Sequence, residues 1–223
     1  MVKRATGFIT GGFRPTNSNT ENWIGQVYLY RENEDIPIDD NGKAMLPLLQ
    51  ICLEGLPYIP DALKGSKVLT IFVSENMPGR LAYNGDAWVI REYKEEDVLV
   101  VKDIYMQSSS RIKPYPLKSQ LITEDYPVWD SGDIPMDIED ELVEMEDSGE
   151  ITDYYDYTDC FAGHKIGGYP NYIQSGIDFG DGYEFMIQIA SDEKANLNII
   201  DSGNFYLAKN SQTGDWRLYC DFY

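Results

Sequence analysis

The amino-acid sequence predicts an α+β protein made mainly of antiparallel β-sheet, with few helices. Three observations lead to this fold class. Apolar runs of strand length recur along the chain between turn-forming Gly, Pro, Asn and Asp residues. Only one segment carries a clear helical pattern, and the 17 tyrosines favour strands. With 223 residues, of which 43% are apolar, the chain suits one packed domain.

The first half of the chain contains most of the predicted strands. A Gly-, Thr- and Asn-rich stretch at residues 7–22 is typical of a loop. Residues 67–74, KVLTIFVS, are mostly apolar, which predicts a strand covered on both faces. We expect strands at residues 23–30, 46–53, 67–74, 87–93 and 98–105.

The middle of the chain reads differently. Residues 108–127 carry three prolines and three adjacent serines, which predicts an exposed or edge-lying connection. Residues 133–149 are predicted to be helical, because Ile138, Leu142 and Met145 fall on one stripe and Gly149 suits a helix end. Beyond the helix, we expect strands at residues 183–190, 204–208 and 216–223.

The predicted helix is strongly acidic, and no Lys or Arg occurs from residue 119 to residue 164. Acids near its C-terminus oppose the helix dipole, so helix stability does not explain them. Candidate partner-binding residues lie on the face opposite the apolar stripe and in the DYYDYTD segment that follows: Asp137, Asp140, Glu144, Asp147, Tyr154, Tyr155 and Tyr157. The alternative is an ordinary solvated helix face and linker.

Two parts of the chain share an order of features that suggests two fused structural repeats. Ile24-Gly25 precedes LLQI at residues 48–51, and Ile166-Gly167 precedes MIQI at residues 186–189. We therefore treat residues 1–223 as one domain, with candidate repeat halves at 1–130 and 160–223 and the acidic helix and linker at 131–159. The alternative is two apolar strands that each bury one glutamine bonded to backbone.

The segment CFAGHKIGGYPNYIQ, residues 160–174, holds the only histidine of the chain. Cys160 and His164 would act as nucleophile and base only if the fold brought them together, and the nearby glycines disfavour the helix that would do so. A turn histidine bonded to backbone is the simpler interpretation. The ligand types around His164 match no zinc motif, so we expect no metal site and no cofactor.

The formal net charge is −20, from 38 acidic and 18 basic residues. Nucleic acid and anionic membrane surfaces would repel such a chain, so neither is an expected partner. Three widely spaced cysteines without a CxxC pair are typical of reduced thiols in a cytoplasmic protein. The N-terminal residues lack the apolar run of a signal peptide, and no stretch has the length of a membrane span.

Five segments carry a family resemblance: KIGGYPNYIQ at 165–174, MIQIASD at 186–192, DSGNFYLA at 201–208, PLLQICLEGLP at 47–57 and KPYPLKSQLITEDYPVWD at 113–130. They resemble the YwqG-like family of bacterial proteins. The resemblance implies an α+β fold and supplies no active site, and some members look like immunity proteins or neighbours of bacterial toxin genes. The run at residues 200–203, IDSG, departs from the Trp-Gly-Asp-like run expected there.

Two functional hypotheses follow. The first is a cytoplasmic, non-enzymatic binding protein that docks a basic protein partner through the acidic helix, as an immunity protein neutralising a cationic toxin would. The second is a small-molecule or hydrolytic site around Cys160, His164 and the Gly167-Gly168 turn, which requires a concave pocket at that place. The sequence leaves enzymatic activity and oligomeric state open.

Overall fold

The computed structural model describes residues 2–79, 81–103 and 110–223. Their strands form one antiparallel sheet in the order β6-β13-β12-β11-β10-β1-β9-β2-β4-β5-β7, with β3 and β8 paired separately. The strands are β1 (Lys3–Thr10), β2 (Asn22–Ile24), β3 (Leu29–Tyr30), β4 (Leu46–Cys52), β5 (Ser66–Val73), β6 (Leu81–Tyr83), β7 (Trp88–Lys94), β8 (Val100–Val101), β9 (Tyr115–Asp125), β10 (Lys165–Gly167), β11 (Tyr183–Ala190), β12 (Asn204–Asn210) and β13 (Trp216–Asp221).

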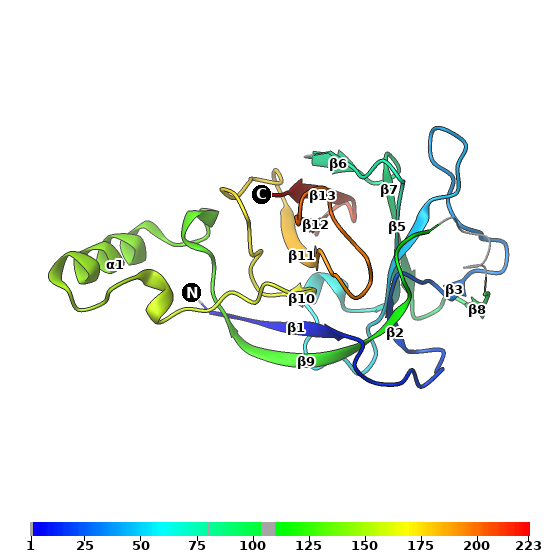
Figure 1. Cartoon of the computed structure of the whole chain (residues 1–223), viewed down its shortest axis with the longest axis horizontal. Coiled ribbons are helices and arrows are strands. Elements are labelled where there is room, and N and C mark those ends of the chain that lie inside the picture. The colour runs from blue at the N-terminus through cyan, green and yellow to red at the C-terminus, as the bar shows by residue number, and fades with distance from the viewer. Residues whose placement is uncertain (1, 80, 104–109) are drawn as a thin grey trace.

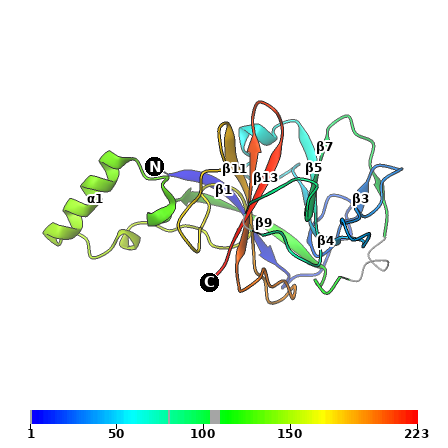
Figure 2. The same cartoon turned by 90° about the horizontal axis from the view of Figure 1, so that it is seen from above.

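The large sheet curls into a nearly closed barrel, which Figures 1 and 2 show from two sides. β6 pairs with β13 at one end of the strand order, and β7 pairs with β5 at the other. A short turn joins β6 directly to β7, so the two ends of the sheet lie next to each other. The main apolar core includes fully buried side chains of β4, β5, β12 and β13, namely Leu48, Ile71, Phe205 and Leu218.

The predicted fold class is confirmed: the structure is mostly antiparallel sheet with a single α-helix among the described residues. Six predicted strands are present with small shifts of their ends, namely β4, β5, β7, β11, β12 and β13. β5 is buried along nearly its whole length, as its continuous apolar run predicts. Side chains cover both faces of such a strand, because it has no solvent-facing alternation.

Two predictions near the N-terminus are wrong. Residues 7–10, predicted as loop, belong to β1, and Gly7 fits there because an added Cβ would lie 3.1 Å from the ring of Phe161. The predicted strand at 23–30 is broken at Gly25, whose φ is +73°. A Cβ at Gly25 would lie 2.5 Å from the carbonyl oxygen of Lys113, so close packing and turning both require glycine.

The predicted connection at 108–127 is also corrected. β9 occupies residues 115–125 and lies inside the sheet between β1 and β2. Pro114 precedes this strand and Pro116 is its second residue, so both prolines stand where a strand tolerates a missing N–H. Residues 108–109, and 104–105 of the strand predicted at 98–105, lie outside the described residues, and β8 covers only two positions of that prediction.

Gln50 of β4 is one of two buried glutamines that occupy matching positions. It lies opposite Trp23 of β2. Its Nε2 donates to the carbonyl oxygen of Glu21 at 3.1 Å, and its Oε1 accepts the N–H of Leu29 at 2.9 Å. The side chain thereby satisfies backbone groups on both sides of the turn at Gly25.

Gln188 of β11 repeats this arrangement. It lies opposite Lys165 of β10, donates through Nε2 to the carbonyl oxygen of Gly163 at 3.1 Å and accepts the N–H of Asn171 at 2.7 Å. A bulge precedes the glutamine in both the β4–β5 and the β11–β12 pairing. Both glutamines are bonded to backbone, and the shared geometry supports the internal repeat, which stays a prediction about how the chain arose.

The acidic helix is α1 (Met136–Ser148). It projects from the barrel together with the segments on either side of it, and we call residues 131–157 the arm (Figures 1 and 2). The helix begins after Pro135 and ends at Gly149, whose φ of +77° forms a left-handed cap, as predicted for that glycine. The start lies three residues later than predicted, because Pro135 serves as the N-cap. None of the helices in the described ranges has the length and apolar character of a membrane-spanning segment.

Candidate functional site

The four acids predicted to face a partner are all on the exposed surface of the arm: Asp137, Asp140, Glu144 and Asp147. α1 has seven acidic and no basic residues in thirteen positions, and none of its residues is fully buried. Met136 and Val143 leave 78% and 42% of their surface exposed among these carboxylates. The arm therefore presents negative charge together with accessible apolar surface.

The tyrosines after the helix divide into two groups. Tyr155 and Tyr157 are exposed at 53% and 67%, as the binding hypothesis requires. Tyr154 is 3% exposed and is corrected from surface anchor to structural residue. Its ring packs against Trp129 with centroids 5.2 Å apart, and its hydroxyl donates to the carbonyl oxygen of Pro127 at 2.8 Å. Burial raises the pKa of Tyr154 to about 12.

The arm is attached to the barrel through this buried tyrosine. The N–H of Tyr154 donates to Glu146 Oε1 at 3.1 Å, and the N–H of Trp129 donates to the hydroxyl of Tyr155 at 3.1 Å. Asp153 caps the short helix η4 (Tyr154–Asp156) with a reciprocal hydrogen-bond pair. These bonds hold the two ends of the arm, so its acidic helix is presented in a defined position.

Cys160 and His164 do not face one another. His164 Nδ1 accepts the N–H of Ala190 at 3.1 Å, and its Nε2 lies 3.3 Å from Asp192 Oδ2. Although burial opposes it, the hydrogen bond from His164 holds the pKa of Asp192 below its usual range. His164 is thus bonded to backbone near a turn, as the simpler interpretation predicts. Burial raises the pKa of the Cys160 thiol, and Lys165 offsets part of this effect.

A buried ion pair lies beneath the Gly167-Gly168 turn, and sequence reasoning missed it. Asp125 and Lys165 have fully buried side chains, and Lys165 Nζ lies 2.8 Å from Asp125 Oδ2. Asp125 also accepts the N–H groups of Phe161 at 2.8 Å and Tyr169 at 2.7 Å. A Cβ on Gly168 would lie 2.0 Å from Asp125 Oδ2, so glycine is needed for this approach. The cluster fastens the 160–170 segment to β9.

A groove with a volume of about 760 Å³ opens beside this turn, where the second hypothesis requires a pocket. Gly167 and Gly168 line it, whereas Cys160 and His164 do not. The groove also includes Asp133 at the base of the arm. The structure therefore brings the glycine turn and the arm to one concave surface, and leaves the thiol and the imidazole outside it.

Residues 24–212 match the family described as Domain of unknown function (DUF1963). The chain belongs to the DUF1963 family. No curated protein sequence matches the chain significantly. The matched region contains both glutamine turns, the arm and the Gly167-Gly168 turn, while β1 and β13 lie outside it.

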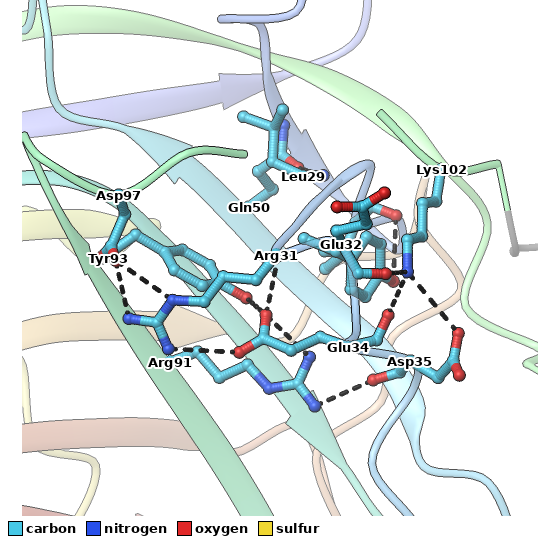
Figure 3. A network of polar contacts seen from close by, with 12 residues as sticks. Leu29, Arg31, Glu32, Glu34, Asp35, Gln50, Arg91, Tyr93, Asp97 and Lys102 are labelled. Atoms are coloured by element: carbon cyan, nitrogen blue, oxygen red, sulfur yellow. Dashed lines mark hydrogen bonds and ion pairs between the residues drawn. The ribbon is translucent and has the colours of Figure 1, made fainter. Parts of the chain in front are cut away.

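Several basic side chains of this DUF1963 protein form ion pairs within the fold, as Figure 3 shows for one cluster beside β7. Arg31 Nη2 lies 2.9 Å from Asp97 Oδ1, and Arg91 Nη1 lies 3.7 Å from Glu34 Oε2. Lys102 Nζ donates to the carbonyl oxygens of Glu32 and Glu34 at 2.6 Å each. By contrast, none of the ion pairs between described residues involves a carboxylate of α1.

Among the residues that the structure describes, no three His, Cys, Asp or Glu side chains are grouped so that they could hold a metal ion. Asp178 accepts the N–H of Gly180 at 2.7 Å in a turn. The three thiols at Cys52, Cys160 and Cys220 are free.

Proposed function

We propose that this DUF1963 protein is a cytoplasmic, non-enzymatic binding protein that docks a basic protein partner through its acidic arm. The contact surface consists of the arm residues that are exposed: Asp137, Asp140, Glu144, Asp147, Tyr155 and Tyr157. Tyr154 is left out of this surface, because it is buried at the base of the arm.

The observation that carries the proposal is the uncompensated charge of α1. Its carboxylates repel one another at i, i+3 and i, i+4 spacing, and those in the last turn oppose the helix dipole. Folding alone would therefore favour fewer acids on this helix. A basic partner would neutralise them, and such complementarity accelerates association and selects the partner.

The exposed tyrosines supply the second part of the interface. An aromatic ring offers large contact area at a low cost in side-chain entropy, and tyrosine is enriched at the energetic centres of interfaces. Tyr155 is held by the hydrogen bond from Trp129, so its ring is already ordered before a partner arrives. Met136 and Val143 add apolar surface along the same arm.

Affinity capture from the native cell lysate tests this proposal, with the wild-type chain compared to a variant in which Asp137, Asp140, Glu144 and Asp147 are changed to Lys. We expect the wild type to retain a basic protein at low salt and release it at high salt, and the variant to retain none. A partner held equally by both chains would contradict the proposal.

A matched control separates the arm from net charge. Asp40, Glu95, Glu96 and Glu193 are exposed acids on other parts of the surface, and changing them to Lys shifts the net charge by the same amount. This control variant should still capture the partner. Loss of capture in the control variant as well would show that the partner is held by non-specific attraction between opposite net charges.

The same proposal includes a bacterial origin of the chain and a toxin as its partner. The resemblance to the YwqG-like family suggests a bacterial immunity protein whose basic partner is a toxin. In that case, the captured protein should be toxic when expressed alone, and co-expression of this chain should restore growth. Restoration by the arm-reversal variant would contradict the immunity role.

The site geometry argues against the hydrolytic form of the second hypothesis. A hydrolytic reaction at Cys160 would need a base within hydrogen-bond reach, and the His164 ring is instead engaged with Ala190 and Asp192. The groove at Gly167 and Gly168 favours binding without hydrolysis.

A further inference from the structure

The groove beside the glycine turn is continuous with the base of the arm. Ser131, Gly132 and Asp133 line it, and the chain enters α1 three residues later. Its charged lining is mostly acidic, with Lys3 as the one lining cation among the described residues. The acids and aromatic side chains of the lining are Asp61, Asp133, Asp178, Glu184, Tyr58, Tyr172, Phe179, Tyr183 and Phe185.

Cations of the chain itself already use the aromatic rings around this groove. The Lys3 ammonium lies 4.0 Å from the centroid of the Tyr169 ring. The guanidinium of Arg217 lies 4.2 Å from the centroid of the Tyr183 ring and donates to the carbonyl oxygen of Phe179. Both contacts have the geometry of cation–π interactions, and Tyr183 lines the groove, so this part of its wall suits a positively charged group.

Asp133 is the carboxylate best placed to receive a further cation. It lines the groove at the start of the arm. Asp133 is exposed at the surface, yet partial desolvation at this position raises its pKa, and the positive charge of Lys3 only partly opposes this effect. A carboxylate in that state gains from an additional positive charge, because it is incompletely compensated in the folded chain.

We propose that this groove binds a lysine or arginine side chain of the basic partner, as the anchoring pocket of the interface whose charged surface is α1. The inference rests on the proposed function, since the same partner would contact the arm. Asp133 receives the cationic group, the aromatic walls enclose its aliphatic part, and Lys3 competes for the same negative charge.

The probe for this pocket is acetyl-arginine amide, with acetyl-citrulline amide as its uncharged analogue. Amide spectra of the ¹⁵N-labelled full chain, recorded during titration, report on Gly168 and Gly176, which both line the groove. We expect saturable shifts at these two glycines with the arginine probe and none with the citrulline probe. Shifts scattered over the acidic surface, or shifts that do not saturate, would overturn the proposal.

Two matched pairs of variants assign the effect to named residues. Asp133→Asn should weaken binding by about threefold, as for a partly exposed charge pair, while Asp130→Asn on the exposed turn before the arm should not. Lys3→Met should strengthen binding by about threefold, while Arg4→Met, an equal change of charge outside the groove, should not. Equal effects within either pair would show that only the overall field matters.

The arm-reversal variant separates this inference from the proposed function. It should bind the arginine probe within about twofold of the wild type, because the four acids lie outside the groove. The same variant should fail to capture the basic partner. Capture that depends on the arm, with no saturable probe binding in the groove, would overturn the pocket and leave the function standing.

Discussion

Glu92 of β7 and Lys209 of β12 form an ion pair, with 2.8 Å between Oε1 and Nζ, which links the last strand at one end of the sheet to the third strand from the other end. Glu92 also accepts from Trp216 Nε1 at 3.2 Å, and Lys209 donates to the carbonyl oxygen of Ala62 at 2.9 Å. Strand pairing joins β7 to neither β12 nor β13, so these side chains link strands that backbone hydrogen bonds do not link.

The free energy of unfolding should therefore fall in acid, as Glu92 becomes protonated. Burial alone would raise the pKa of Glu92, but hydrogen bonds from Lys209, Lys94 and Ser66 lower it from its usual 4.5 to about 2. Because the folded-state pKa is depressed, the stabilisation is complete above about pH 4.5 and is lost as the pH falls towards 2. It is on the order of 3 kcal/mol.

Urea denaturation at several pH values checks this prediction. Glu92→Gln should lower the free energy of unfolding at pH 7 and flatten its decline between about pH 4.5 and 2. The exposed neighbour Glu96, changed to Gln, is the control and should leave the profile unchanged. An unaltered pH profile of the unfolding free energy in Glu92→Gln would show that stability does not depend on this carboxylate.

Gly168→Ala should destabilise the fold more than its backbone angle explains. Gly214 has a similar φ, +79° against +73°, and a Cβ there would meet nothing within 4 Å. Gly214→Ala should therefore cost only the left-handed conformation, about 1–2 kcal/mol. Gly168→Ala should cost about 1–3 kcal/mol more, because its Cβ overlaps Asp125. Equal losses of unfolding free energy would contradict the described approach of these two residues.

The pair of Asp125 and Lys165 makes a prediction about charge. Lys165→Met should lower the free energy of unfolding by about 3–5 kcal/mol, because it leaves a buried carboxylate unpaired. Adding Asp125→Asn should recover part of this loss, since the amide carries no charge and its oxygen can still accept one backbone N–H. A double variant that is less stable than Lys165→Met alone would contradict this explanation.

The two matching glutamines should be equally important. Gln50→Leu and Gln188→Leu each leave buried backbone groups without partners, so each should cost about 1–3 kcal/mol in unfolding free energy. Gln212→Leu, at an exposed turn, should cost little. A large effect at only one of the two positions would argue against equivalent roles for the two turns.

Local patterns in the sequence predicted most of the fold. The helix was predictable because its apolar stripe and Gly149 lie within one segment. Likewise, apolar runs identified β4, β5 and β11. β9 was missed because Pro114 and Pro116 suggested an edge, although Pro114 precedes the strand and Pro116 is only its second residue. β6 and β10 have three residues each, too few for a periodic signal.

The site was predictable only in part. Exposed acids on one helix face follow from helical geometry, so their placement could be read from spacing. The sequence predicts Tyr154 to be exposed, because no local pattern indicates its contact with Trp129, 25 residues earlier. The ion pair of Asp125 and Lys165 joins residues 40 positions apart, and the groove joins several distant segments. Such features depend on topology rather than on local pattern.

Hydrogen–deuterium exchange tests whether the acidic arm contacts a basic partner. Exchange would be measured on the chain alone and on the complex eluted from the capture experiment. We expect slower exchange within residues 131–157 and unchanged exchange at the far end of the barrel, around residues 31–36. Protection confined to other surfaces, with the arm exchanging as in the free chain, would contradict the proposed contact.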